Sequence, residues 1–156
     1  MTPAPRTTGP GADEVLAGGC LCGAIRFEAE GPPRETAFCH CRMCQRNSGN
    51  VFAVYASYAS DRVRFLAGRP KVYRSSSFAE RGFCAECGTP LTFQYLAGPE
   101  DIGLTVGSFD EPARLAPQSH DGIESWVPWL KISDGLPRRR TEEDPEFLER
   151  RSYAEP

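Results

Sequence analysis

The sequence predicts a mainly β domain with short helices, held together by clustered cysteines. Short β-type runs are separated by Gly, Pro, Ser or Asp along most of the chain, a spacing typical of all-β domains. Apolar Ile25 and Phe27 alternate with charged neighbours, as expected of a strand with one face in water. Seven cysteines fall into three tight clusters, with the patterns C-x-C, C-x-C-x2-C and C-x2-C.

Length and composition fit one folded unit between two polar ends. A chain of 156 residues is close to the usual size of a single domain. Residues 1–14 are rich in Pro, Gly and Thr and are predicted to form a flexible N-terminal tail, because they carry too little apolar surface to offset the entropy of ordering. The predicted domain spans residues 15–137, and the charged segment 138–156 is predicted to be a solvated C-terminal tail.

The secondary structure within these bounds is read from short local patterns. One helix is predicted over residues 42–48, ending at Gly49, and another after Asp144-Pro145, through Arg151. Seven strands are predicted, at 24–29, 51–55, 63–66, 71–74, 91–95, 102–106 and 126–132.

Charge and hydropathy exclude several classes of function. The formal net charge of −3 argues against nucleic acid as a partner, because phosphate binding usually requires a basic excess. The sequence has no secretory signal and no apolar run near the roughly 18 residues of a membrane span. We therefore expect a cytoplasmic protein that does not enter membranes. Cysteines kept reduced there indicate metal binding or catalysis rather than disulfides.

Two of the cysteine clusters form half-sites for a tetrahedral ion. Cys20 and Cys22 face the same side of an extended segment, so both thiolates can bind one ion. Cys84 and Cys87 form a C-x2-C knuckle, the commonest half-site for zinc. Together the two pairs complete a four-thiolate shell that links the start of the domain to its middle.

The third cluster supplies three cysteines within six residues, Cys39, Cys41 and Cys44. Three protein ligands are typical of a catalytic zinc site, which keeps one position for water or substrate. An iron–sulfur cluster is the rival interpretation, but a grouping of two, three and two fits four plus three zinc ligands better. Spacing alone also allows the C-x2-C pair of this cluster to combine with Cys84 and Cys87.

Four segments carry motifs that closely resemble the glutathione-dependent formaldehyde-activating enzyme family, which also includes centromere protein V. The segments are 19–28 (GCLCGAIRFE), 39–49 (CHCRMCQRNSG), 81–91 (RGFCAECGTPL), and Pro128-Trp129 with 134–137 (DGLP). The resemblance extends over residues 16–137. It implies a β-tent fold stapled by zinc.

The resemblance also assigns two zinc ions and an activity. It implies a structural zinc on Cys20, Cys22, Cys84 and Cys87, and a second, catalytic zinc on Cys39, Cys41 and Cys44. The implied reaction is a carbon–sulfur lyase reaction that adds the thiol of glutathione to formaldehyde, so the expected partners are a small-molecule thiol and an aldehyde. The true thiol and aldehyde, and the oligomeric state, are not determined by the sequence.

Three further side chains are candidates for binding substrate: Arg42, Arg46 and His120. The arginines could bind glutathione carboxylates or offset the charge of the cluster, or simply be solvated. His40 lies between two ligands, so we expect it to point away from the metal and orient the site. In the family a large apolar residue typically follows the histidine at position 120, whereas Asp121-Gly122 follow here.

The main alternative to an enzyme is a non-catalytic, zinc-stapled interaction module on the same fold. That alternative predicts that the second zinc is absent or sealed by a fourth protein ligand. A methionine sulfoxide reductase would need a further reactive cysteine, and no cysteine follows Cys87.

Overall fold

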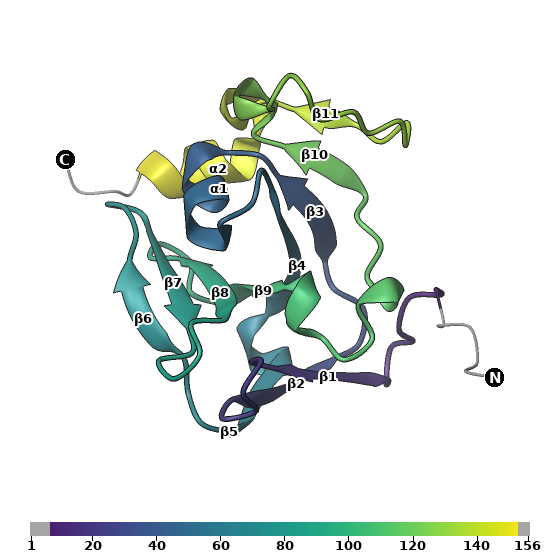
Figure 1. Cartoon of the computed structure of the whole chain (residues 1–156), viewed down its shortest axis with the longest axis vertical. Coiled ribbons are helices and arrows are strands. Elements are labelled where there is room, and N and C mark those ends of the chain that lie inside the picture. Colours follow the sequence, from purple (N-terminus) through teal and green to yellow (C-terminus); the bar gives the residue numbers. More distant parts are fainter. Residues whose placement is uncertain (1–6, 153–156) are drawn as a thin grey trace.

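The structure, a computed structural model, describes residues 7–152, with side chains placed for residues 7–150. Its strands form one sheet of three strands and one of eight, and two short α-helices lie at the end of the molecule opposite the small sheet (Figure 1). The prediction of a mainly β fold with short helices is therefore confirmed.

The small sheet has the antiparallel order β1-β2-β5. Its strands are β1 (Val15–Gly19), β2 (Arg26–Glu30) and β5 (Val63–Ala67). Phe27 and Ala29 are fully buried, whereas Glu28 between them points out and pairs with Arg64. This alternation is the period-two pattern that the sequence shows, and it places one face of the sheet on the core.

The large sheet has the order β11-β10-β3-β4-β9-β8-β7-β6. Most neighbours are antiparallel, but β10 runs parallel to both β3 and β11. The strands are β3 (Glu35–Cys39), β4 (Ala53–Ala59), β6 (Lys71–Arg74), β7 (Ala79–Phe83), β8 (Pro90–Tyr95), β9 (Asp101–Thr105), β10 (Ser119–Asp121) and β11 (Arg138–Arg139).

The main core lies where the two sheets meet. Phe27 from the small sheet packs edge-on against Phe109, with ring centroids 5.1 Å apart. Tyr58, Leu91 and Leu104 from the large sheet complete this cluster, and each is at most 1% exposed. Because the cluster draws on both sheets, burial of its apolar surface favours their association.

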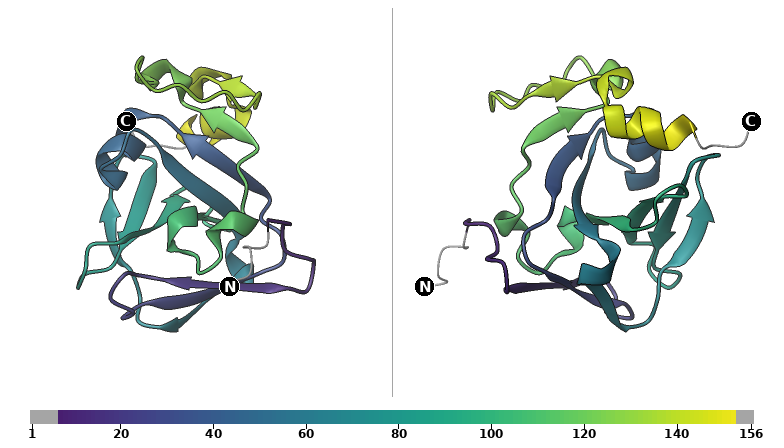
Figure 2. Two further views of the ribbon diagram at one scale, coloured as in Figure 1. Left: turned by 45° about the vertical axis from the view of Figure 1, so that its right-hand side comes forward. Right: turned by 180° about the vertical axis from the view of Figure 1, so that it is seen from behind.

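Helix α1 (Arg42–Ser48) follows β3 directly. The Cys41 side chain caps it by accepting a hydrogen bond from the Cys44 N–H, and Gly49 ends it in the left-handed region at φ 65°. The prediction of this helix is confirmed, because both end signals are local in the sequence. Helix α2 (Pro145–Ser152) lies at the same end of the molecule (Figure 2). Neither helix within residues 7–152 is long and apolar enough to cross a bilayer.

The strand predicted over residues 126–132 is wrong. A 3-10 turn at Ile123–Ser125 leads into this segment, and the N–H of Leu130 then closes a turn onto the carbonyl of Val127. Pro128 lies inside that turn and has no N–H to give to a sheet. Conversely, β1, β3, β7, β10 and β11 were not predicted.

Both predicted tails contact the body within the described residues. Residues 7–14 supply the carbonyls of Thr8 and Gly9, which accept hydrogen bonds from the guanidinium of Arg114 at 3.0 and 3.2 Å. At the other end, β11 extends the large sheet, and Arg150 of α2 forms an ion pair with Asp101 at 3.0 Å. Residues 1–6 and 153–156 lie outside the described range.

Candidate metal centres

The first candidate centre joins the loop after β1 to the loop after β7. Its four sulfur atoms lie within 4.8 Å of one another and belong to Cys20, Cys22, Cys84 and Cys87. The Sγ–Sγ distance is 3.5 Å from Cys20 to Cys22 and 3.8 Å from Cys22 to Cys84. A tetrahedral zinc ion with Zn–S bonds of about 2.3 Å has sulfur–sulfur edges of about 3.8 Å, so the donor set fits zinc.

The backbone of both loops is shaped around the sulfurs. Gly23 has φ 79° and donates its N–H to the carbonyl of Cys20 at 3.1 Å, which closes the first turn. Gly88 has φ 77° and donates to the carbonyl of Cys84 at 2.8 Å, which closes the second. The N–H of Ile25 points at Cys20 Sγ from 3.2 Å. Such N–H contacts stabilise sulfur in its thiolate form.

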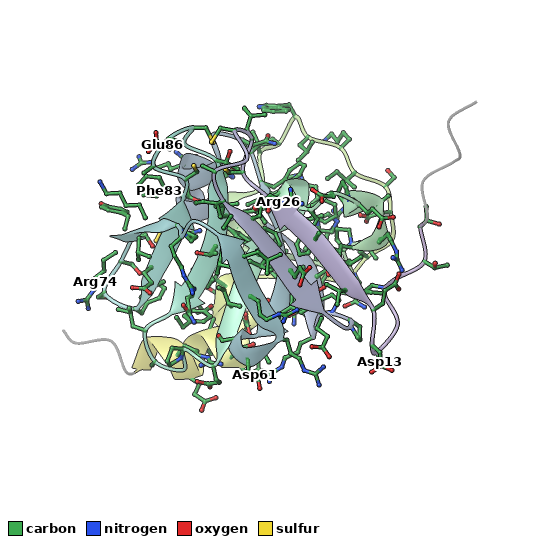
Figure 3. All side chains as sticks on the ribbon, turned by 90° about the horizontal axis from the view of Figure 1, so that it is seen from below. Asp13, Arg26, Asp61, Arg74, Phe83 and Glu86 are labelled. Atoms are coloured by element: carbon green, nitrogen blue, oxygen red, sulfur yellow. The ribbon has the colours of Figure 1, made fainter. Side chains whose placement is uncertain are left out.

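This centre connects the two sheets. The N–H of Leu21 in the first loop donates to Thr89 Oγ1 after the second loop, at 3.1 Å. In Figure 3, Phe83 and Glu86 lie beside the end of the small sheet at which Arg26 begins β2. A metal ion held by these four cysteines would cross-link the two sheets.

The second candidate centre is built where β3 passes into α1. Cys39 ends the strand, Cys41 caps the helix, and Cys44 lies in its first turn. Their sulfurs also lie within 4.8 Å of one another. Among the described residues, no fourth cysteine, histidine or carboxylate joins them. The geometry thus groups the seven cysteines as four and three.

The three thiols of the second centre compete for negative charge. Hydrogen bonds from the side chains of Cys39, which has the larger effect, and Cys44 lower the pKa of the Cys41 thiol far below its usual range. The same contact with Cys41, reinforced by Cys44 and by burial, raises the pKa of Cys39 well above its usual range. Protein groups alone therefore favour one thiolate here. A bound divalent cation would favour three, because coordination deprotonates thiols.

These three thiols line a cleft of about 1420 Å³. That volume exceeds the roughly 300–1,000 Å³ of common ligand pockets. One part of its lining is a chain of aromatic rings whose neighbouring centroids lie 4.9–6.4 Å apart. In order of contact the rings are Tyr55, Phe93, Tyr95, Phe78 and Phe147. The chain of rings leads from the sheet beside the thiols to helix α2.

Arg81 lies between this aromatic lining and the thiols, although it is only 3% exposed. Its Nη1 donates to the Tyr55 hydroxyl at 2.9 Å, and its Nη2 lies 3.5 Å from Cys44 Sγ. Its Cζ sits 4.8 Å from the centroid of Phe93. The sequence alone indicates no role for Arg81, although it lies three residues before Cys84, within the 81–91 motif.

A buried pair of histidines lies next to the second centre, outside the lining of the cleft. His40 Nε2 and His120 Nδ1 lie 2.9 Å apart, and His120 Nε2 lies 2.8 Å from a carboxylate oxygen of Asp134. Both rings are fully buried, and Trp126 stacks on His40 at 4.1 Å. Burial, followed by the charge of His120, lowers the pKa of His40 to about 4, so the ring is neutral at pH 7. His40 thereby anchors the Cys39–Cys41 segment.

The structure separates the three candidate substrate-binding residues. Arg42 lines the cleft, where its guanidinium donates to the side chain of Gln45. Arg46 is exposed and does not contribute to the cleft lining. His120 is fully buried against His40 and likewise does not line the cleft.

The Asp121-Gly122 pair has a local explanation. Gly122 has φ 67°, and a Cβ at this position would lie 2.8 Å from the Cys41 nitrogen. A residue with a side chain would therefore collide with Cys41, one of the three cysteines of the second centre. Asp121 accepts a hydrogen bond from Arg139 Nε at 2.8 Å, although burial raises the pKa of its carboxyl. Sequence reasoning noticed the pair but not its contact with Cys41.

Comparison with known sequences gives one family and several relatives. The sequence model of the family described as "Glutathione-dependent formaldehyde-activating enzyme" matches residues 15–127. An "uncharacterized lyase" of Schizosaccharomyces pombe is 38% identical over 92 residues, which are 59% of this chain and 66% of the relative, about two thirds of its length. A "Putative glutathione-dependent formaldehyde-activating enzyme" of Halomonas elongata is 28% identical over 127 residues, covering 76% and 81% of the two chains.

Comparison with solved structures supports the fold. A crystal structure of a Rhodobacter sphaeroides protein aligns with a TM-score of 0.51 at 22% sequence identity. The alignment covers 79% of this chain and 98% of that protein. The likeness concerns the fold alone.

Proposed function

The chain belongs to the glutathione-dependent formaldehyde-activating enzyme family, and from this membership we propose that it is a zinc-dependent carbon–sulfur lyase. The proposed reaction adds a thiol, glutathione or a similar molecule, to formaldehyde or another small aldehyde. One relative is named a lyase and another a formaldehyde-activating enzyme, which supports this chemical class.

The observation that carries the proposal is the position of the second cluster. Cys39, Cys41 and Cys44 bring three sulfurs within 4.8 Å of one another and line the large cleft. Three protein ligands are the usual number in catalytic zinc sites, whereas structural sites use four. The first cluster has four and would hold the structural zinc.

The reaction needs a thiolate and a correctly placed aldehyde. The carbon–sulfur bond forms as the carbonyl π bond breaks, and the thiol proton ends on the new hydroxyl oxygen. A zinc ion, when bound, favours ionised thiols near neutral pH and polarises carbonyl oxygens. The three cysteines would hold that ion beside the cleft. The cleft has room for both reactants, and holding them together replaces a bimolecular encounter.

Arg42 is the candidate group for orienting the thiol substrate. It lines the cleft and follows Cys41 directly, and its planar guanidinium can bind a carboxylate through two hydrogen bonds. Arg46 and His120, which do not line the cleft, are then candidates for indirect roles only.

The alternative of a non-catalytic module predicts a fourth protein ligand or no second metal. Among the described residues, no further His, Cys, Asp or Glu donor joins the three thiols. This observation favours the enzyme.

The test combines metal analysis with exchange spectroscopy. We expect two zinc ions in the purified protein, and faster exchange between formaldehyde and its thiol adduct by NMR when the protein is present. Cys44→Ser should retain one zinc ion and lose the acceleration. Arg69→Met, a substitution outside the cleft, should retain two zinc ions and the acceleration. Two zinc ions without acceleration for any of a panel of thiols would instead support the interaction module.

A further inference from the structure

Arg81 is a buried cation whose partners do not include a carboxylate. It is 3% exposed, and no ion pair with Asp or Glu is found for it within residues 7–150. Its neighbours are the Tyr55 hydroxyl, the Phe93 ring and Cys44 Sγ. Its Nε finds no hydrogen-bond partner in the described part of the chain. A guanidinium placed in this way is costly unless nearby negative charge offsets its desolvation.

The thiols of the second cluster are the nearest source of that charge. Three thiolates exceed the charge of one divalent ion by one negative unit, and one guanidinium restores neutrality. Nη2 of Arg81 lies 3.5 Å from Sγ of Cys44, a residue that is only 4% exposed, whereas Cys39 and Cys41 are half-buried. Arg42 is exposed and bonded to Gln45, so it is less suited to this task.

We propose that Arg81 is a positioning residue of the second metal centre, which holds the Cys44 thiolate and balances the charge of the three-thiolate cluster. Tyr55 and Phe93 fix its side chain from β4 and β8, so three strands of the large sheet and helix α1 meet at one guanidinium. The proposal rests on the proposed role of this cluster as a metal site. It does not require a particular thiol or aldehyde.

The experiment measures cobalt(II) binding by the metal-free protein, because cobalt in thiolate sites absorbs visible and near-ultraviolet light. Two equivalents should bind to the unaltered protein. Arg81→Met should weaken the equivalent at the second cluster by about 10- to 100-fold, as loss of outer-shell partners usually does. Arg81→Lys, which keeps the positive charge but not the paired N–H donors of the guanidinium, should lose less cobalt affinity at that cluster. Tyr55→Phe, which removes the hydroxyl partner, should also lose less than Arg81→Met.

Arg69→Met is the matched control. Its guanidinium also lies over a phenylalanine, with Cζ 5.6 Å from the centroid of Phe65, but it does not line the cleft. We expect unchanged cobalt affinity at both centres in this variant. Circular dichroism of all variants checks that each is folded.

Unchanged affinity at the second cluster in a folded Arg81→Met protein would overturn the proposal. If Arg81→Met does not fold, the cobalt affinities of Tyr55→Phe and Arg81→Lys decide the question. Full affinity at the second cluster in both of these variants would overturn the proposal. The lyase proposal is tested separately, by whether the unaltered protein accelerates exchange between formaldehyde and its thiol adduct. Weakened cobalt binding in Arg81→Met would stand even if no aldehyde proved to be a substrate.

Discussion

Gly122 lies against Cys41, and its backbone adopts φ 67°, which L residues with a Cβ rarely adopt. A Cβ here would lie 2.8 Å from the Cys41 nitrogen and 3.0 Å from its Cβ. We expect Gly122→Ala to lower the free energy of unfolding by at least about 2 kcal/mol, because backbone strain adds to displacement of the ligand segment. Zinc analysis should show less than two equivalents.

Gly135 provides the control for backbone strain alone. It has φ 69°, but a Cβ there would meet no atom within 4 Å. Gly135→Ala should therefore cost only about 1–2 kcal/mol and leave the zinc content unchanged. Equal losses of zinc in the two variants would mean that contact with Cys41 is not the cause.

At the same scale, the sequence predicted the donor groups of the candidate site better than their surroundings. The cysteines were identifiable because each cluster is local, with two or three sulfurs inside six residues. Arg81 was missed because its contacts with Cys44 and Tyr55 span 37 and 26 residues. Asp134 belongs to the 134–137 motif, but its role is not visible in the sequence, since only the fold brings it to His120.

Among the elements, helix α2 forms part of the cleft wall. Its Phe147 packs edge-on against Phe78, with ring centroids 5.5 Å apart, and both residues line the cleft. We expect Phe147→Ala to raise the KM for the thiol several-fold, since it removes one end of the aromatic lining. The free energy of unfolding should fall by only about 1 kcal/mol, because the side chain is half-buried.

Leu148, the next residue, is the control because it is 48% exposed and does not line the cleft. Leu148→Ala should change the free energy of unfolding by no more than about 0.5 kcal/mol and leave the KM unaltered. A similar KM in both variants would show that Phe147 does not contribute to substrate binding.

The elements also show where sequence patterns stop being informative. Helix α1 was predicted with its bounds, because Gly49 ends it locally. Strands β10 and β11 have three and two residues, and each is defined by parallel pairing with a distant segment. No window of that length carries a periodic signal. Residues 126–132 look like a strand in composition, but the turn at Pro128 prevents pairing.

For the molecule as a whole, the first cluster should dominate stability. Apparent zinc-binding energies of about 10–16 kcal/mol are as large as the stability of an entire domain, about 5–15 kcal/mol. We expect Cys87→Ser to prevent folding, because it removes one sulfur from the proposed structural zinc site, whose four cysteines come from loops of both sheets. Cys44→Ser should remain folded, because its cluster lies within the single β3–α1 segment.

Circular dichroism and metal analysis of both variants distinguish the two clusters. A strong chelator, which removes zinc, should unfold the unaltered protein, just as the Cys87→Ser substitution is expected to prevent folding. A well-folded Cys87→Ser protein with undiminished zinc would contradict the assignment of Cys20, Cys22, Cys84 and Cys87 as the structural site.

The long sequence separation within the first cluster has a consequence for biosynthesis. Cys22 and Cys84 are 62 residues apart, yet their sulfurs lie 3.8 Å from each other. At about 5–20 residues per second, a ribosome needs several seconds to supply the second pair after the first has emerged. During that interval the nascent small sheet lacks its cross-link. The yield of native protein should therefore follow the zinc supply of the cell at the time of translation, and chains made under zinc starvation should accumulate as aggregates.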